Sequence, residues 1–128
     1  MRVWTIQLAK WRMLTRTEVH LIDTTVKSGI KELAPSWDLL TRYRMDPVGM
    51  EATYRAEFAE LMSRSQEEHP EVWDGLLRME SVALACYCRP GKFCHRHLLT
   101  EMLVEYGRKR DVEVKLMGEW GDDSGSEE

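Results

Sequence analysis

No run of apolar residues in this 128-residue chain approaches the roughly 20 that a membrane-spanning helix requires. The start also lacks the basic segment followed by an apolar stretch that marks a secretory signal. Cysteine is scarce: the three cysteines are odd in number and crowd into nine residues, so they suit reduced thiols better than a disulfide framework. We therefore expect a soluble, cytoplasmic protein.

Familiar nucleotide and metalloprotease motifs are missing as well, because the chain has no Walker A loop, no GxGxxG and no HExxH. It also lacks a basic excess: 18 Lys and Arg face 22 Asp and Glu, a net charge of -4. Residues 1–44 carry +4, residues 45–85 carry -6 and residues 86–120 carry +2. This balance argues against an extended nucleic-acid footprint and leaves room for a local basic pocket.

The length and an apolar content of 43% suit one domain with its own core. Hydrophobic patterning predicts strands at residues 3–8, 19–22, 82–85 and 112–116, and helices after Ser36, near Pro47, at Pro70 and after Cys94. Strands separated by helical crossovers predict an α/β fold: a single three-layer domain, residues 1–120, with a small mostly parallel sheet flanked by helices. The acidic, Gly- and Ser-rich tail, residues 121–128, has no apolar residue and is expected to be disordered.

The segment from Cys86 to His97 holds every cysteine, two of the four histidines and three cations. An apolar strand pattern precedes it and a helical pattern follows, so it forms a strand-to-helix loop at the carboxyl edge of the sheet. The backbone N–H groups that begin such a helix bind anions. We expect Lys92 to add a point charge there and Arg96 to add a bidentate fork, unless Arg96 instead pairs with an acidic helix.

A second polar loop, starting at Asp23, follows the predicted strand at residues 19–22 and should reach the same sheet edge. The hydroxyls of Thr24 and Thr25 and the ammonium of Lys27 suit a phosphate group. The Asp23 carboxylate suits ribose hydroxyls or acid–base work. The competing interpretation is that Asp23 only caps the next turn.

The candidate catalytic residues are Asp23, Cys94 and His95. His95 and His97 lie about 100° apart on a helix, so at most one faces the crevice, and His95 is nearer the helix end. A thiol at a helix N-terminus beside a histidine and an arginine should have a lowered pKa. Cys94 lacks the spacing from Arg96 that a cysteine phosphatase requires, and it could instead be a small packing residue.

We expect no cofactor, with zinc as the alternative. Cys86, Cys88 and Cys94, with His97 or its neighbour His95, would supply three sulfurs and a nitrogen. The spacing opposes this, because Cys86 and Cys88 would lie on one strand with side chains roughly 7 Å apart, whereas zinc sites usually take their first ligands from a turn.

Five tryptophans suggest a competing function. Trp11 in a loop and Trp120 beside the tail could belong to a protein-binding surface, since aromatic residues anchor such interfaces. Trp4, Trp37 and Trp73 fall on apolar positions of predicted elements and are expected in the core. The alternative function is thus a non-catalytic interaction module, for example a phage-encoded protein that modulates a host protein.

Four short segments carry a family resemblance: Trp4-Thr5-Ile6, the strand end at Asp23, Pro35-Ser36-Trp37, and above all Cys94-His95-Arg96. In these the chain resembles the bacterial and phage family called domain of unknown function 488, over roughly residues 3–107. It departs at Cys88, near which many relatives have a glutamate. The resemblance implies an α/β fold and a shared pocket around Asp23, Cys94, His95 and Arg96.

These observations together predict a small α/β protein that binds a phosphate-bearing small molecule, a nucleotide or nucleotide-sugar, at the carboxyl edge of its sheet. The same groups could also act on that ligand.

Overall fold

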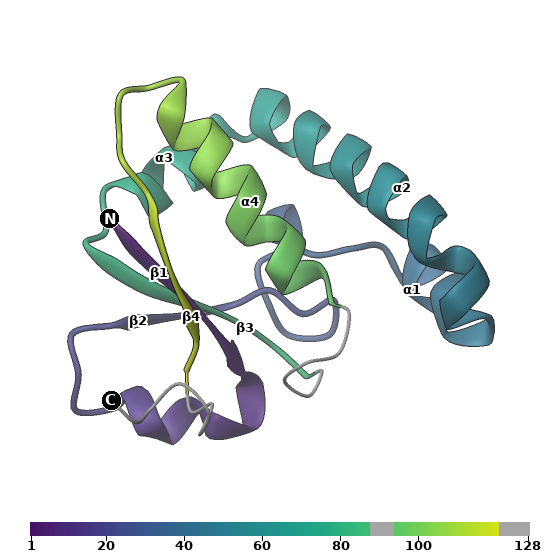
Figure 1. The fold of residues 1–128 in the computed structure, drawn as a ribbon, viewed down its shortest axis with the longest axis horizontal. Helices are drawn as coiled ribbons and strands as arrows, with labels where there is room; N and C mark the ends of the chain where they lie inside the picture. Colours follow the sequence, from purple (N-terminus) through teal and green to yellow (C-terminus); the bar gives the residue numbers. More distant parts are fainter. Residues whose placement is uncertain (88–93, 121–128) are drawn as a thin grey trace.

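The computed structural model describes residues 1–87 and 94–120, and within them the elements follow the predicted order (Figure 1). The strands are β1 (Arg2–Gln7), β2 (His20–Asp23), β3 (Ser81–Cys86) and β4 (Lys115–Glu119). The α-helices are α1 (Trp37–Met45), α2 (Pro47–Glu68), α3 (Pro70–Leu77) and α4 (His95–Arg108). Two 3-10 helices, η1 (Leu8–Leu14) and η2 (Lys31–Leu33), lie in the connections.

The described strands form one sheet in the order β2-β3-β1-β4, with every pair parallel. All four α-helices pack on one face of the sheet, where side chains such as Val82, Phe58, Trp73 and Leu99 make the main core. A smaller cluster around Ile6 covers the other face. The 3-10 helix η1 lies on that side of the sheet (Figure 1). The predicted three-layer α/β architecture is therefore confirmed.

Local sequence signals explain where the helices begin. The Ser36 hydroxyl accepts a hydrogen bond from the Leu39 amide at 3.0 Å and caps α1. Asp46 caps α2 in the same way, and prolines open both α2 and α3. Proline suits the first helical turn because its missing N–H would have no partner there.

Two sequence expectations are wrong. The last strand covers Lys115–Glu119 and not residues 112–116, because its register is set by pairing with β1, where Arg2 meets Lys115. Trp37, expected in the core, is 56% exposed, since it occupies the first turn of α1.

Other regions differ less. The expected loop around Trp11 is the 3-10 helix η1. In the part of the chain that the structure describes, no helix combines the length and the apolar character needed to cross a membrane. The expected disordered tail, residues 121–128, lies outside the described residues.

Candidate functional site

The two polar loops predicted from the sequence meet at one edge of the sheet. Asp23 ends β2 and is paired in register with Ala85, one residue before the end of β3. The backbone amide and the hydroxyl of Thr24 both donate to the Ala85 carbonyl, at 3.0 and 2.8 Å. Thr24 thereby fixes the first loop against the strand that leads into the second.

His95, the first residue of α4, lies directly against this junction. Its Nε2 is 2.8 Å from the Thr24 carbonyl oxygen and 3.0 Å from the Thr24 hydroxyl. Because a carbonyl can only accept, Nε2 carries the proton, and Nδ1 presents a lone pair 3.6 Å from the Cys94 sulfur. The side chain is buried, and burial is the main cause of its lowered pKa.

Asp23 is held by its own loop. One carboxylate oxygen accepts from the Thr25 amide and hydroxyl at 2.9 and 2.7 Å, and the other accepts from the Ser28 hydroxyl at 2.6 Å. Burial alone would raise the pKa of Asp23, but the hydrogen bonds from Ser28 and Thr25 outweigh burial and lower it. Asp23 is therefore an anion that both caps its turn and stands beside the site.

Arg96 points behind the site, into the protein. Its guanidinium is fully buried and donates to the Cys86 sulfur at 2.7 Å and to Glu119 at 3.1 Å. The Thr5 hydroxyl donates to the other Glu119 oxygen at 2.6 Å. Burial would lower the pKa of Arg96, but the Cys86 and Cys94 sulfurs and Glu119 outweigh burial and raise it. The phosphate-binding role of Arg96 stays a prediction, and a ligand would share the guanidinium with these partners.

A hollow of about 310 Å³, which we call the edge pocket, opens at this edge of the sheet. Its lining combines cations, exposed aromatics, apolar side chains and ionisable groups, contributed by Thr25, Val26, Lys27, Pro35, Trp37, Leu40, Arg44, Cys86, Tyr87 and His95. The predicted residues Thr25, Lys27 and His95 thus share one cavity.

Some candidates lie just outside this lining. Thr24 is fully buried and orients His95, so its hydroxyl is turned toward the protein. Asp23 belongs to the loop that carries Thr25. Cys94 lies behind His95. Cys88 and Lys92 fall outside the described residues.

Sequence reasoning missed the part of the edge-pocket lining that α1 and Tyr87 supply. Arg44 had no special status in the sequence, and Trp37 was assigned to the core. A signal existed in the Pro35-Ser36 helix start, because a residue in the first turn after such a cap often projects beyond the helix end toward solvent.

One group of described side chains could hold a metal ion. The sulfurs of Cys86 and Cys94 and a ring nitrogen of His95 all lie within 4.8 Å of one another, and all three residues are buried. Of the two histidines that the sequence offered, His95 is the one that joins these sulfurs within the described residues. Whether the site holds zinc stays a prediction, and Cys88 lies outside the described residues.

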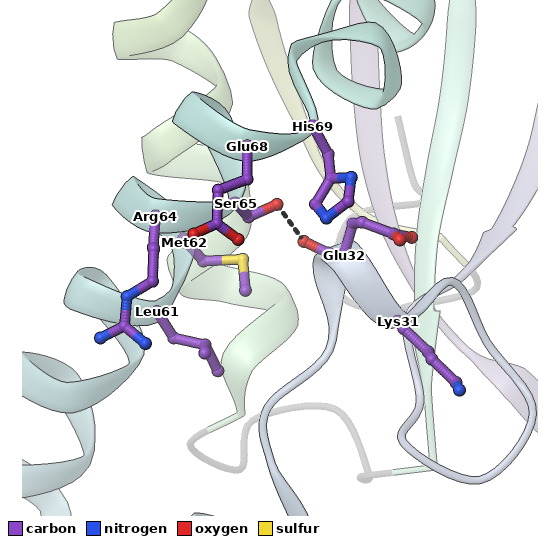
Figure 2. A pocket seen from close by; sticks show the side chains of 8 residues that line it. All are labelled: Lys31, Glu32, Leu61, Met62, Arg64, Ser65, Glu68 and His69. Atoms are coloured by element: carbon purple, nitrogen blue, oxygen red, sulfur yellow. Dashed lines mark hydrogen bonds between the residues drawn. The ribbon is translucent and has the colours of Figure 1, made fainter.

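A second hollow of about 230 Å³ lies between η2 and α2 (Figure 2). Ser65 crosses its floor: it donates to the Glu32 carbonyl at 2.7 Å and accepts from the Trp73 indole at 3.0 Å. The first bond joins α2 to η2, and the second joins α3 to α2. None of the predicted site residues that the structure describes lines this hollow, so the edge pocket is the candidate functional site.

Residues 2–107 match a family model described as DUF488-N3a, the active DUF488-N3 subclade. No curated protein matches the chain. No solved structure matches it either.

Proposed function

The chain belongs to the DUF488-N3a family, and from that membership and the make-up of the edge pocket we propose that it binds a phosphate-bearing small molecule there, a nucleotide or nucleotide-sugar. The observation that carries the proposal is that one cavity brings together two cations, two exposed aromatics and an imidazole. Its volume of about 310 Å³ lies at the lower end of the range for small-molecule sites, roughly 300–1,000 Å³.

The lining divides by chemistry into two parts. Trp37 and Tyr87 are each 56% exposed and, with Leu40, offer apolar surface on which a base or sugar ring can stack. Lys27 and Arg44 supply the positive charge that a phosphate group requires. This combination favours a ligand with a flat ring at one end and an anion at the other.

Two groups suited to acid–base work lie in or near the same cavity: His95 lines it, and Asp23 belongs to the loop that carries Thr25 and Lys27. The Asp23 carboxylate and the His95 imidazole are both fixed by hydrogen bonds to the loop that follows β2. The family description calls its subclade active and names no reaction. The two fixed ionisable groups and the word active in the family description both support a reaction on the bound ligand as well as binding.

The proposal is tested by calorimetric titration of the purified protein with AMP, ADP and UDP-glucose, with adenosine and inorganic phosphate for comparison. We expect the nucleotides to bind more tightly than either part alone. Arg44→Ala and Lys27→Ala should each weaken nucleotide binding about tenfold, the lower end for a charge-assisted hydrogen bond because both side chains are exposed.

The matched control is Arg64→Ala, which removes an exposed cation that lines the hollow beside α2. It should leave nucleotide affinity unchanged. Absence of nucleotide binding at millimolar concentration, or an equal loss in the Arg64 variant, contradicts the proposal.

The competing function, a non-catalytic module that binds a protein partner, is favoured by one observation. Trp11 is 42% exposed and the nearby Met13 is 50% exposed, both on η1 at the face of the sheet opposite the α-helices. Exposed aromatic and methionine side chains are typical of protein interfaces.

A further inference from the structure

We propose that Cys86, Cys94 and His95 form a zinc site that has, among the described residues, three ligands and an open coordination position facing the edge pocket. The three ligand atoms lie within 4.8 Å of one another. Cys86 ends β3, Cys94 is the N-cap of α4 and His95 is its first residue. Cysteine sulfurs and histidine nitrogens are the usual protein ligands of Zn²⁺. This inference goes beyond the proposed function, because binding the metal requires no nucleotide.

The separation of one ligand pair already fits a bound zinc ion. Zn–S and Zn–N bonds of about 2.3 and 2.05 Å at a tetrahedral angle place the sulfur and nitrogen about 3.6 Å apart. The Cys94 sulfur and the His95 Nδ1 are 3.6 Å apart. The separation of this pair therefore already matches that of two ligands of one zinc ion.

The surroundings of His95 match those of a metal-binding histidine. Such a histidine usually donates its other ring N–H to a carbonyl or carboxylate, which fixes the tautomer and aims the lone pair at the metal. Here Nε2 donates to the Thr24 carbonyl at 2.8 Å, and Nδ1 faces the Cys94 sulfur. Thr24 thus acts as a positioning residue for the ligand atom.

The surroundings of Cys86 fit a thiolate ligand. Arg96 donates to its sulfur at 2.7 Å, and Glu119 holds the guanidinium from the other side. A zinc-bound thiolate keeps lone pairs that accept such N–H bonds, and the positive charge offsets part of the ligand charge. When Zn²⁺ binds, the two thiol protons leave to solvent and both sulfurs become thiolates.

The described residues supply three ligand atoms to this site, one fewer than a purely structural zinc site has. Structural zinc sites are closed by four protein ligands, whereas catalytic sites have three protein ligands and an open position for water or substrate. Cys86 and His95 both line the edge pocket. Within residues 1–87 and 94–120 the fourth position is open, and it would face the cavity, where a water molecule or a phosphate oxygen could reach the metal.

The test uses the full chain, reduced with a phosphine, stripped with a chelator and desalted. Titration with Co²⁺ should give thiolate-to-cobalt absorption and the visible bands of a tetrahedral ion, saturating at about one equivalent. Zn²⁺ should then displace the cobalt and remove the visible bands.

His95→Gln should weaken Co²⁺ binding at least about tenfold, the lower limit for disturbing a metal site. Its matched control is His97→Gln, which alters the neighbouring histidine on α4 and should bind as the wild type does. Circular dichroism melting curves show which variants fold, and Cys94→Ser serves if His95→Gln does not.

A wild-type protein that gives no tetrahedral cobalt spectrum and retains no zinc overturns the proposal. Equal losses in the His95 and His97 variants overturn it as well. Nucleotide binding is measured on the metal-stripped protein, so failure of the zinc site and failure of the nucleotide site are distinguishable.

Discussion

At the scale of single residues, the loop after β2 depends on a close backbone approach at Gly29. Its amide donates to the Thr25 carbonyl, and the next amide donates to the Asp23 carbonyl at 2.8 Å. A Cβ atom at Gly29 would lie 2.3 Å from the Asp23 carbonyl oxygen, which belongs to the backbone and cannot swing aside. The absence of a side chain lets the loop close over the edge of the sheet.

We expect Gly29→Ala to lower the free energy of unfolding by about 1–3 kcal/mol, the usual cost of overpacking, and to weaken nucleotide binding because Thr25 and Lys27 move. Urea unfolding measures the first effect. The control is Gly75→Ala in α3, where a Cβ meets nothing within 4 Å. That variant should gain about 0.5–1 kcal/mol from helix propensity. A Gly29 variant as stable as the control would contradict this account.

Asp23 gives the loop a defined pH dependence. Its pKa is lower in the folded protein than its ordinary value of 3.8. Such a group stabilises the fold above the unfolded-state pKa, and this stability is lost as the pH falls through the folded-state pKa. The difference in unfolding free energy between wild type and Asp23→Asn should therefore be largest near about pH 7 and shrink below about pH 3.8. Urea unfolding of both proteins across this pH range measures the difference. A difference that grows as the pH falls would contradict this account.

At the scale of elements, the buried pair between Arg96 and Glu119 joins the start of α4 to the last strand. The Arg96 side chain is fully buried and the Glu119 side chain is 9% exposed. Removing one partner of a buried pair leaves an uncompensated charge in a poorly solvated place. The cost is larger than the net contribution of the pair itself.

Glu119→Gln should therefore lower the free energy of unfolding by about 3 kcal/mol, the lower end for such a change because the amide keeps one acceptor. Thermal unfolding followed by circular dichroism checks it. Glu57→Gln is the control, because its bond with Arg42 lies in solvent. Its melting temperature should stay close to that of the wild type. Similar melting temperatures for the two variants would mean that losing one partner of the buried pair does not destabilise the fold.

At the scale of the whole molecule, two exposed tryptophans separate the competing functions. Trp37 lines the edge pocket, whereas Trp11 lies on η1 beneath the other face of the sheet. If the protein works through the edge pocket, Trp37→Ala should weaken nucleotide binding by about 1–3 kcal/mol, the range for one stacked base. Trp11→Ala should then leave the nucleotide affinity unchanged. Calorimetric titration of both variants measures these affinities.

The reverse result would favour the interaction module. In that case Trp11→Ala would abolish capture of a protein partner while both variants leave nucleotide titrations flat. Both side chains are large and exposed, so neither change should cost much stability, and melting curves confirm that each variant is folded.

Much of this architecture was predictable because its signals are local. Ser36, Pro47 and Pro70 mark helix starts through bonds within one turn, and the apolar run before Cys86 is typical of a buried strand. The register of β4 was not predictable, since it is set by pairing with β1. For the site, the loops at Asp23 and His95 could be found from the rule that parallel strands end at one edge. The Arg96 contacts and the Trp37 wall depend on elements that meet only in three dimensions.

The link between Thr5, Glu119 and Arg96 also bears on how the protein is made. Thr5 and Glu119 are 114 positions apart along the chain. During translation β1 therefore leaves the ribosome long before β4 does. Until Glu119 emerges, the Arg96 guanidinium lacks the carboxylate that pairs with it in the folded protein, and burying it would be costly. The contacts of Arg96 with Cys86 and Glu119 should therefore form only after β4 has emerged, and a nascent chain stalled before residue 119 should present an incomplete edge pocket.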